Sequence, residues 1–169
     1  MSEAKFGEAF IQHEFDEAIA IQQAIVDGAT KLAKSHPRRA AKQAITSALT
    51  EDREFLKTLK QLGMKHDATG KAEGVALALK NLMELTAKSV GEAPSEAYEA
   101  HAVLINLKRK QQDSAAAMVK IARETDDDEL RDAAVEFGKA TKASAQVLAD
   151  DLALFAVEIA TREPAIARR

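Results

Sequence analysis

The chain has 169 residues, of which 46% are hydrophobic and only 4% aromatic, and its net charge is -3. This length fits one domain with a single continuous core, so we expect one helical-bundle domain over residues 1–169. The small negative charge argues against nucleic acid as a partner. The absence of cysteine excludes disulfides, thiolate metal sites and a cysteine nucleophile.

Ala and Leu dominate the chain, whereas Gly (7) and Pro (3) are scarce, and this composition favours helix over sheet. The first residues lack the basic segment and apolar run of a signal peptide. No apolar stretch approaches the ~20 residues that a membrane-spanning helix needs. We therefore expect a cytoplasmic protein with no transmembrane segment.

Apolar residues spaced three and four apart predict a first long helix over about residues 3–34 and a second over about 37–65. Pro37 separates the two helices, because proline disfavours helix at the preceding residue but suits the first turn of the next. His36 and His66 fall at these helix ends, so we expect both side chains to be exposed to solvent.

A shorter helix is predicted over about 72–90, and Gly91 to Pro94 then separate it from a long helix over about 95–124. Thr125 is expected to cap the last helix, over about 126–162. Asp126 to Glu129 place negative charge in its first turn, where the helix dipole favours it. The pattern predicts an all-α, antiparallel up-down four-helix bundle with one additional short helix.

Polar residues interrupt the inward faces of the last two helices where a bundle normally buries leucine. These residues are Lys108, Gln111, Gln112, Thr141 and Ser144. Four-helix bundles that bind metals place their ligands at such central positions. The question for this chain is whether its side chains suit a metal.

One carboxylate, Asp52, falls on the inward face of the second helix, and Glu14 and Glu17 lie beside the inward face of the first. A lone carboxylate in a bundle interior is costly unless it is paired. We therefore hypothesise that Lys108 neutralises Asp52, Glu14 or Glu17 where metals would otherwise lie. In the alternative interpretation these charged groups extend along the helix surface and reach water.

A di-iron carboxylate site needs a Glu-x-x-His motif from each of two helices. None of the four histidines has a glutamate three residues before it, since those positions hold Phe10, Ala33, Gly63 and Tyr98. His101 has Glu99 nearby, but residues two apart do not share a helix face. We expect His101 to be a partly buried packing residue, and we predict no metal ligand, catalytic residue or cofactor.

The helix layout resembles the ferritin-like superfamily, in particular its small bacterial stress proteins, over most of residues 5–160. Three short segments carry the resemblance: Asp52 to Gly63, Glu73-Gly74, and Val103 to Ile105. The resemblance implies two long helices, a short helix and two more long helices.

The same resemblance implies a degenerate metal site. The family's Glu-His-x-Glu stretch falls near Gln111-Gln112-Asp113-Ser114, its last Glu-Glu-Lys near Ala140-Thr141-Lys142, and its second-helix histidine near Ile45. With a register different by one turn, Glu96, Glu99, His101 and Asp113 become candidate ligands instead.

We therefore expect a non-enzymatic, stress-associated or partner-binding bundle that self-associates, most simply as a homodimer. One alternative is a metal-binding ferritin-like oxidase or iron store. A second is an amphipathic surface or scaffold protein similar to the phasins, which would cover a lipid or polymer surface.

Overall fold

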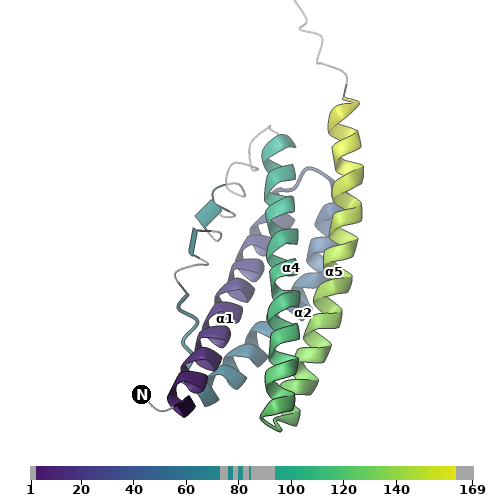
Figure 1. Cartoon of the computed structure of the whole chain (residues 1–169). Coiled ribbons are helices and arrows are strands. Elements are labelled where there is room, and N and C mark those ends of the chain that lie inside the picture. Colours follow the sequence, from purple (N-terminus) through teal and green to yellow (C-terminus); the bar gives the residue numbers. More distant parts are fainter. Residues whose placement is uncertain (1–2, 73–75, 78–79, 82–83, 85–93, 163–169) are drawn as a thin grey trace, which may run out of the picture.

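The computed structural model describes residues 3–72, 76–77, 80–81, 84 and 94–162. These contain four long helices: α1 (Glu3–Ser35), α2 (Arg39–Gly63), α4 (Pro94–Glu124) and α5 (Asp128–Ala160), with the 3-10 turn η1 (Met64–His66) after α2 (Figure 1). No strand occurs in this part of the chain, so the expected all-α class is confirmed. The short helix expected over 72–90 lies mostly outside the described residues.

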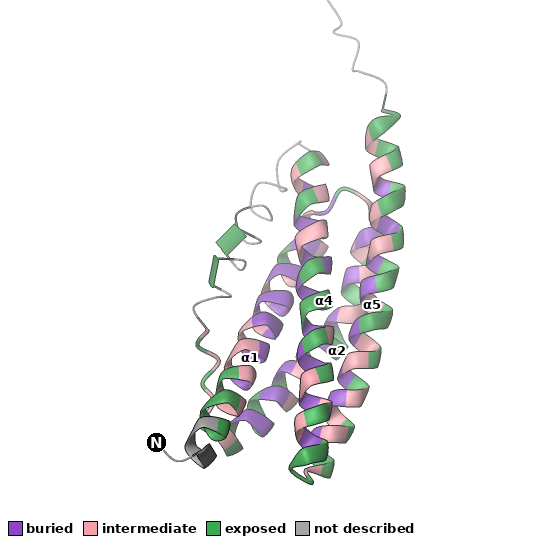
Figure 2. Ribbon diagram, in the orientation of Figure 1, coloured by how far each residue is buried: buried purple, intermediate pink, exposed green. Residues whose placement is uncertain are grey.

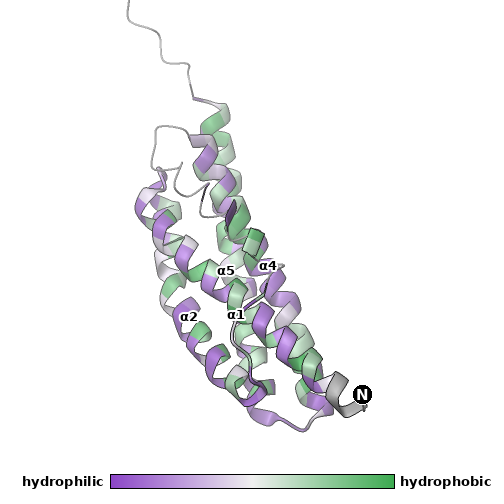
Figure 3. Ribbon diagram, turned by 90° about the vertical axis from the view of Figure 1, so that its left-hand side faces the viewer, coloured by the Kyte–Doolittle hydropathy of each residue, from purple (hydrophilic) through white to green (hydrophobic). Residues whose placement is uncertain are grey.

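The four helices share one core. α1 packs mainly on α2 and α4 on α5, while α1 also contacts α4 and α2 contacts α5. Figure 2 shows the buried residues as stripes on the faces that meet, and Figure 3 shows hydrophobic and hydrophilic bands alternating along the helices. Residues that are 0–2% exposed line these faces on every helix: Phe15, Ile25, Leu32, Ile45, Leu104, Met118, Phe137 and Leu148.

Two helix starts differ from the sequence prediction. α2 begins at Arg39 and not at Pro37, because Arg38 has extended backbone (φ -87°, ψ 121°) and precedes the first helical residue. α5 is capped by Asp127, whose side chain accepts a hydrogen bond from the N–H of Leu130 (2.9 Å). The expected cap, Thr125, is instead bonded back to Ile121 at the end of α4 (3.0 Å).

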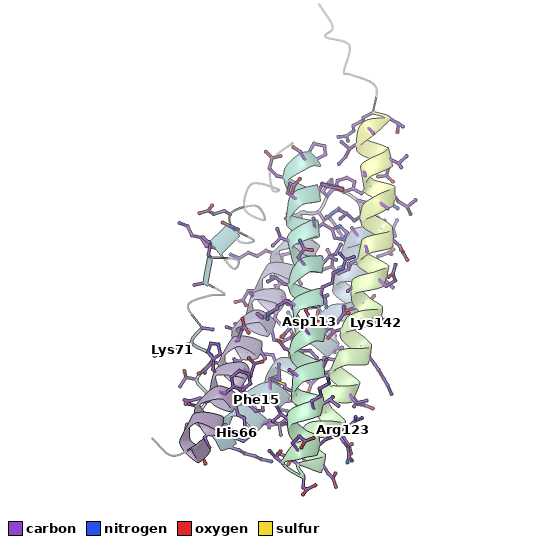
Figure 4. The ribbon with its side chains drawn as sticks, in the orientation of Figure 1. Phe15, His66, Lys71, Asp113, Arg123 and Lys142 are labelled. Atoms are coloured by element: carbon purple, nitrogen blue, oxygen red, sulfur yellow. The ribbon has the colours of Figure 1, made fainter. Side chains whose placement is uncertain are left out.

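The segment after α2 is fixed against α1. Asp16 Oδ1 accepts hydrogen bonds from the backbone N–H groups of Thr69 (2.6 Å) and Gly70 (2.7 Å). Gly70 has φ +75°, and a Cβ there would lie 2.6 Å from Ile19 Cγ2, so only glycine suits this position. His66 stacks on Phe15 with ring centroids 5.2 Å apart (Figure 4). It is therefore half-buried and not fully exposed as expected.

None of the helices in the described residues combines the length and the apolar character that crossing a membrane would require.

Candidate functional site

A buried ion pair joins α2 and α4 in the interior of the molecule. Lys108 Nζ lies 2.6 Å from Asp52 Oδ1 and 2.7 Å from Oδ2, so both carboxylate oxygens accept hydrogen bonds from the ammonium group. Lys108 is 1% exposed and Asp52 is 4% exposed. Of the two interpretations drawn from the sequence, pairing is confirmed and extension to water is wrong.

The other two carboxylates proposed as partners lie elsewhere. Glu14 and Glu17 are half-buried at the side of α1. Glu17 faces Lys110 at 3.5 Å, and the Lys110 side chain is 49% exposed. The structure therefore selects Asp52 as the partner of Lys108, because Asp52 alone lies on the inward face of its helix.

Two glutamines extend the ion pair into a polar layer. Gln111 Nε2 donates to the backbone carbonyl of Ala18 (2.8 Å) and to Gln22 Oε1 (3.0 Å). Gln22 Nε2 in turn donates to the backbone carbonyl of Asp52 (2.9 Å). We call Gln22, Asp52, Lys108 and Gln111 the central polar layer. It ties α1, α2 and α4 together through hydrogen bonds that exist in only one helix register.

The remaining polar residues predicted at the centre differ in how far they are buried. Thr141 is 2% exposed, and its hydroxyl has no hydrogen-bond partner among the described residues; the same is true of Gln111 Oε1. Gln112 and Ser144 are only half-buried and lie at the edge of the inward faces. Gln22 was missed by the sequence analysis, although it follows the same helical spacing as Phe15, Ala18 and Ile25.

A second polar cluster lies at the end of the molecule where α1 passes into α2. His36 and His101 are both 0% exposed, and His36 Nε2 lies 3.3 Å from His101 Nδ1. The two rings meet edge to face, and His36 also packs on Phe155 with centroids 4.9 Å apart. The prediction of an exposed His36 is wrong, because this connection turns inward and contacts α4 and α5. His101 is fully buried rather than partly buried.

Ionic contacts surround the His36–His101 pair. Arg38 Nε donates to Asp151 Oδ1 (2.8 Å), and Arg38 Nη1 also pairs with Glu158 on α5. Asp151 is 9% exposed, and its Oδ2 has no hydrogen-bond partner among the described residues. The sequence analysis missed Asp151, although it lies one helical turn from both Leu148 and Phe155 on the buried face of α5.

Burial sets the protonation state of this pair. The pKa of His36 is lowered to about 4, mainly by loss of solvation and secondly by the nearby His101, while Asp151 opposes the shift. Loss of solvation also lowers the pKa of His101, against the opposing effects of Asp151 and the backbone of Leu148. Both rings are therefore neutral near pH 7.

The donor atoms present do not suit a metal centre. Within the described part of the chain, no three His, Asp or Glu residues are grouped so that they could hold an ion. In the register shifted by one turn, Glu99 and Asp113 are exposed on α4, whereas His101 is buried. At the centre, the ammonium group of Lys108 already binds the carboxylate of Asp52. The other side chains of the central polar layer are the neutral amides of Gln22 and Gln111.

Comparison with known proteins adds no assignment. No protein-family model matches the sequence, and no curated protein or solved structure has significant similarity to the chain. The function must therefore be argued from the residues themselves.

Proposed function

We propose that this protein is a non-enzymatic, ferritin-like helical bundle made of two antiparallel helix pairs, in which a lysine–aspartate pair replaces the di-iron centre. Its role is to bind a partner, including a second copy of itself, and not to oxidise iron. A cytoplasmic location and an association with stress follow from the sequence and its resemblance alone. The single observation that carries the proposal is the position of Lys108.

The cross-helix contacts support the antiparallel arrangement. Gln111 on α4 bonds to Ala18 on α1, whereas His36, just after α1, meets the earlier α4 residue His101. α1 and α4 therefore run in opposite directions. The three-residue connections after Ser35 and Glu124 favour reversal between α1 and α2 and between α4 and α5. Together these contacts favour an up-down-down-up order in place of the expected up-down order, as in bundles with one long crossover connection, the ferritin-like folds among them.

The chemistry of the central polar layer supports the loss of metal binding. A di-iron centre of this kind needs several carboxylates and imidazoles directed inward. Here Lys108 supplies a fixed positive charge that repels a cation, and Gln22 and Gln111 supply neutral amides. Asp52 cannot bind a metal without leaving Lys108 as an unpaired buried charge, which costs several kcal/mol.

Elemental analysis of protein purified without chelator tests this proposal. We expect iron, manganese and zinc far below one ion per chain, and no rise in melting temperature when Fe(II) or Mn(II) is added. Stoichiometric metal, or a metal-dependent rise in melting temperature that Asp52→Asn removes, would contradict the proposal.

The outer surface of α5 supports a binding role. Val147, Leu154 and Val157 are 55–59% exposed, and the last turns of α5 extend past the start of α4 (Figure 1). Exposed apolar side chains gathered on one helix are typical of association surfaces. We propose that this surface pairs two copies of the chain.

Sedimentation velocity tests the self-association. We expect a dimer for the unaltered protein and a monomer for Leu154→Glu. Met64→Glu is the matched control, because Met64 is equally apolar and 67% exposed but lies outside α5. A monomeric parent protein, or a dimer that survives Leu154→Glu, would eliminate this surface as the interface.

A further inference from the structure

The hydrogen bonds of the His36–His101 pair define which nitrogen atoms carry protons. The backbone N–H of Arg38 donates to His36 Nδ1 (3.1 Å), so Nδ1 must be unprotonated and the ring proton lies on Nε2. His36 Nε2–H then donates to His101 Nδ1 at 3.3 Å. His101 therefore carries its own proton on Nε2, which has no hydrogen-bond partner among the described residues. The result is a series of two hydrogen bonds that point in one direction, from the backbone of Arg38 to His36 and from His36 to His101 on α4.

This series of hydrogen bonds has no position for an additional proton. Protonation of His36 adds an N–H at Nδ1, where it faces the N–H of Arg38. Protonation of His101 adds an N–H at Nδ1, where it faces the N–H of His36. Either event places two donors against each other and replaces a hydrogen bond with a repulsive contact. The buried pair therefore accepts a proton only if one of these two hydrogen bonds breaks: the bond from Arg38 to His36, or the bond between the two rings.

The same hydrogen bonds disfavour a metal ion between the two rings. A metal bound at His36 Nε2 would require the ring proton to move to Nδ1, where it would again face the N–H of Arg38. The nearest carboxylate, Asp151, is already bonded to Arg38 through Oδ1. The pair is thus arranged for hydrogen bonding between neutral rings.

Charged groups approach the pair from the α2 side and from α5. On the α2 side, Arg38 contributes the backbone N–H, and the positive charge of Lys42 lowers the pKa of His36 slightly. On α5, the negative charge of Asp151 raises the pKa of both rings, and Glu158 pairs with Arg38. On α4, Tyr98 packs against Phe155, with centroids 6.3 Å apart. Asp151 is the one carboxylate acting directly on the rings, and Arg38 already offsets its charge.

Solvent reaches close to the pair. A pocket with an empty volume of about 350 Å³, part of it open to water, is lined by Pro37, Arg38, Pro94, Phe155 and Ile159 among others. Phe155 lines this pocket and also contacts His36. Phe155 therefore connects the wall of this pocket to the buried ring of His36.

We propose that the His36–His101 pair is an acid-sensitive latch, which holds the α1–α2 connection against α4 and α5 at neutral pH and releases it in mildly acidic solution. Release separates residues 36–38 from His101 and exposes Phe155 at one end of the bundle. The central polar layer stays closed, because its contacts do not involve the imidazoles.

The direction of the pH effect follows from the lowered pKa values. A free histidine titrates near 6.5, and His36 in the closed state titrates at about 4. The open state therefore binds more protons between these two values, and opening becomes more favourable as the pH falls from about 6.5. The His36 shift alone increases the opening equilibrium constant about 30-fold at pH 5, and about 300-fold well below pH 4.

Hydrogen exchange of the intact chain at pH 7 and pH 5, corrected for intrinsic exchange rates, tests the latch. We expect amides of residues 34–42 to lose protection about 20-fold more than amides of residues 104–112 between these two pH values. Equal loss in both regions, or no loss, would overturn the proposal. Nitrogen chemical shifts of the imidazoles supply a second measurement: both rings should be Nε2-protonated at pH 7, and a pKa of 6 or above for His36 contradicts the latch.

A double variant separates titration from packing. His36→Gln with His101→Asn keeps one amide donor facing one carbonyl acceptor but cannot accept a proton. We expect it to lose the extra exchange at pH 5. His13→Gln is the control, because His13 is exposed and its replacement should leave the pH response unchanged. If the double variant does not fold, the measurements on the unaltered chain still decide the question.

Discussion

The centre and the α1–α2 end of this bundle bury polar groups in two different ways. At the centre, Asp52 and Lys108 remain charged because each compensates the other at 2.6–2.7 Å. At the end, His36 and His101 are buried because both are neutral, and burial lowers the pKa values of both rings. The first arrangement compensates a buried charge with the opposite charge, whereas the second has no partner for an added proton. The comparison can be tested by removing a charge from one region or adding one to the other.

The largest effect is expected from Lys108→Met, which leaves Asp52 buried without a partner. We expect the free energy of unfolding to fall by about 3–5 kcal/mol in urea denaturation at pH 7. Lys110→Met is the matched control, since Lys110 is half-exposed beside Glu17 and should change stability by less than about 1 kcal/mol. Similar losses in both variants would contradict a buried pair.

The second effect concerns the histidine end and follows from pH alone. The lowered pKa of His36 makes the closed state less stable as the pH falls below about 6.5, and this contribution is fully present above that value. Between pH 7 and pH 5 we expect a loss of about 2 kcal/mol in the free energy of unfolding of the unaltered protein. In the His36→Gln, His101→Asn variant, stability over the same range should depend much less on pH.

Gln111→Leu tests whether the central polar layer needs its amides as well as its ion pair. The substitution leaves Gln22 Oε1 buried without its donor and removes the bond to Ala18. We expect a loss of about 1–2 kcal/mol in urea denaturation. Gln112→Leu, at the half-buried neighbouring position, should have little effect, and a stabilised Gln111→Leu variant would show that the layer is dispensable.

The smallest effect separates the two candidate caps of α5. Asp127→Ala removes the hydrogen bond to the N–H of Leu130 and should cost about 1 kcal/mol. Thr125→Ala should cost less, because its hydroxyl bonds back into α4. Thermal denaturation of both variants beside the parent protein gives the order, and the reverse order would contradict the cap assignment.

Helix periodicity predicted every end of the four long helices to within two residues, and it also predicted the inward positions of Asp52 and Lys108. Periodicity predicts which face of a helix is buried, and a carboxylate with an amine on buried faces indicates an ion pair. It does not predict where a connection turns. His36 lies outside both helices, so nothing in the spacing indicated that Ser35 to Arg38 turn inward.

The same limit explains the other differences. Asp151 and Gln22 are polar residues within otherwise apolar series, and their roles depend on which helix lies opposite, which spacing does not give. The choice of Asp127 over Thr125 depends on the positive φ of Asp126 (53°), a feature of one turn and not of composition. Sequence patterns thus gave the helix faces, whereas the partners of each buried group required the three-dimensional arrangement.

The ion pair also has a consequence for how the chain assembles. Asp52 belongs to the first pair of helices and Lys108 to the second, so neither pair contains the counterion for its own buried charge. A half-formed intermediate must therefore keep this carboxylate or this amine in water, and neutralisation occurs only when the halves dock. The pair thus favours docking in the correct register, because helices that dock one turn out of register would bury both charged groups, unpaired, in the apolar interior.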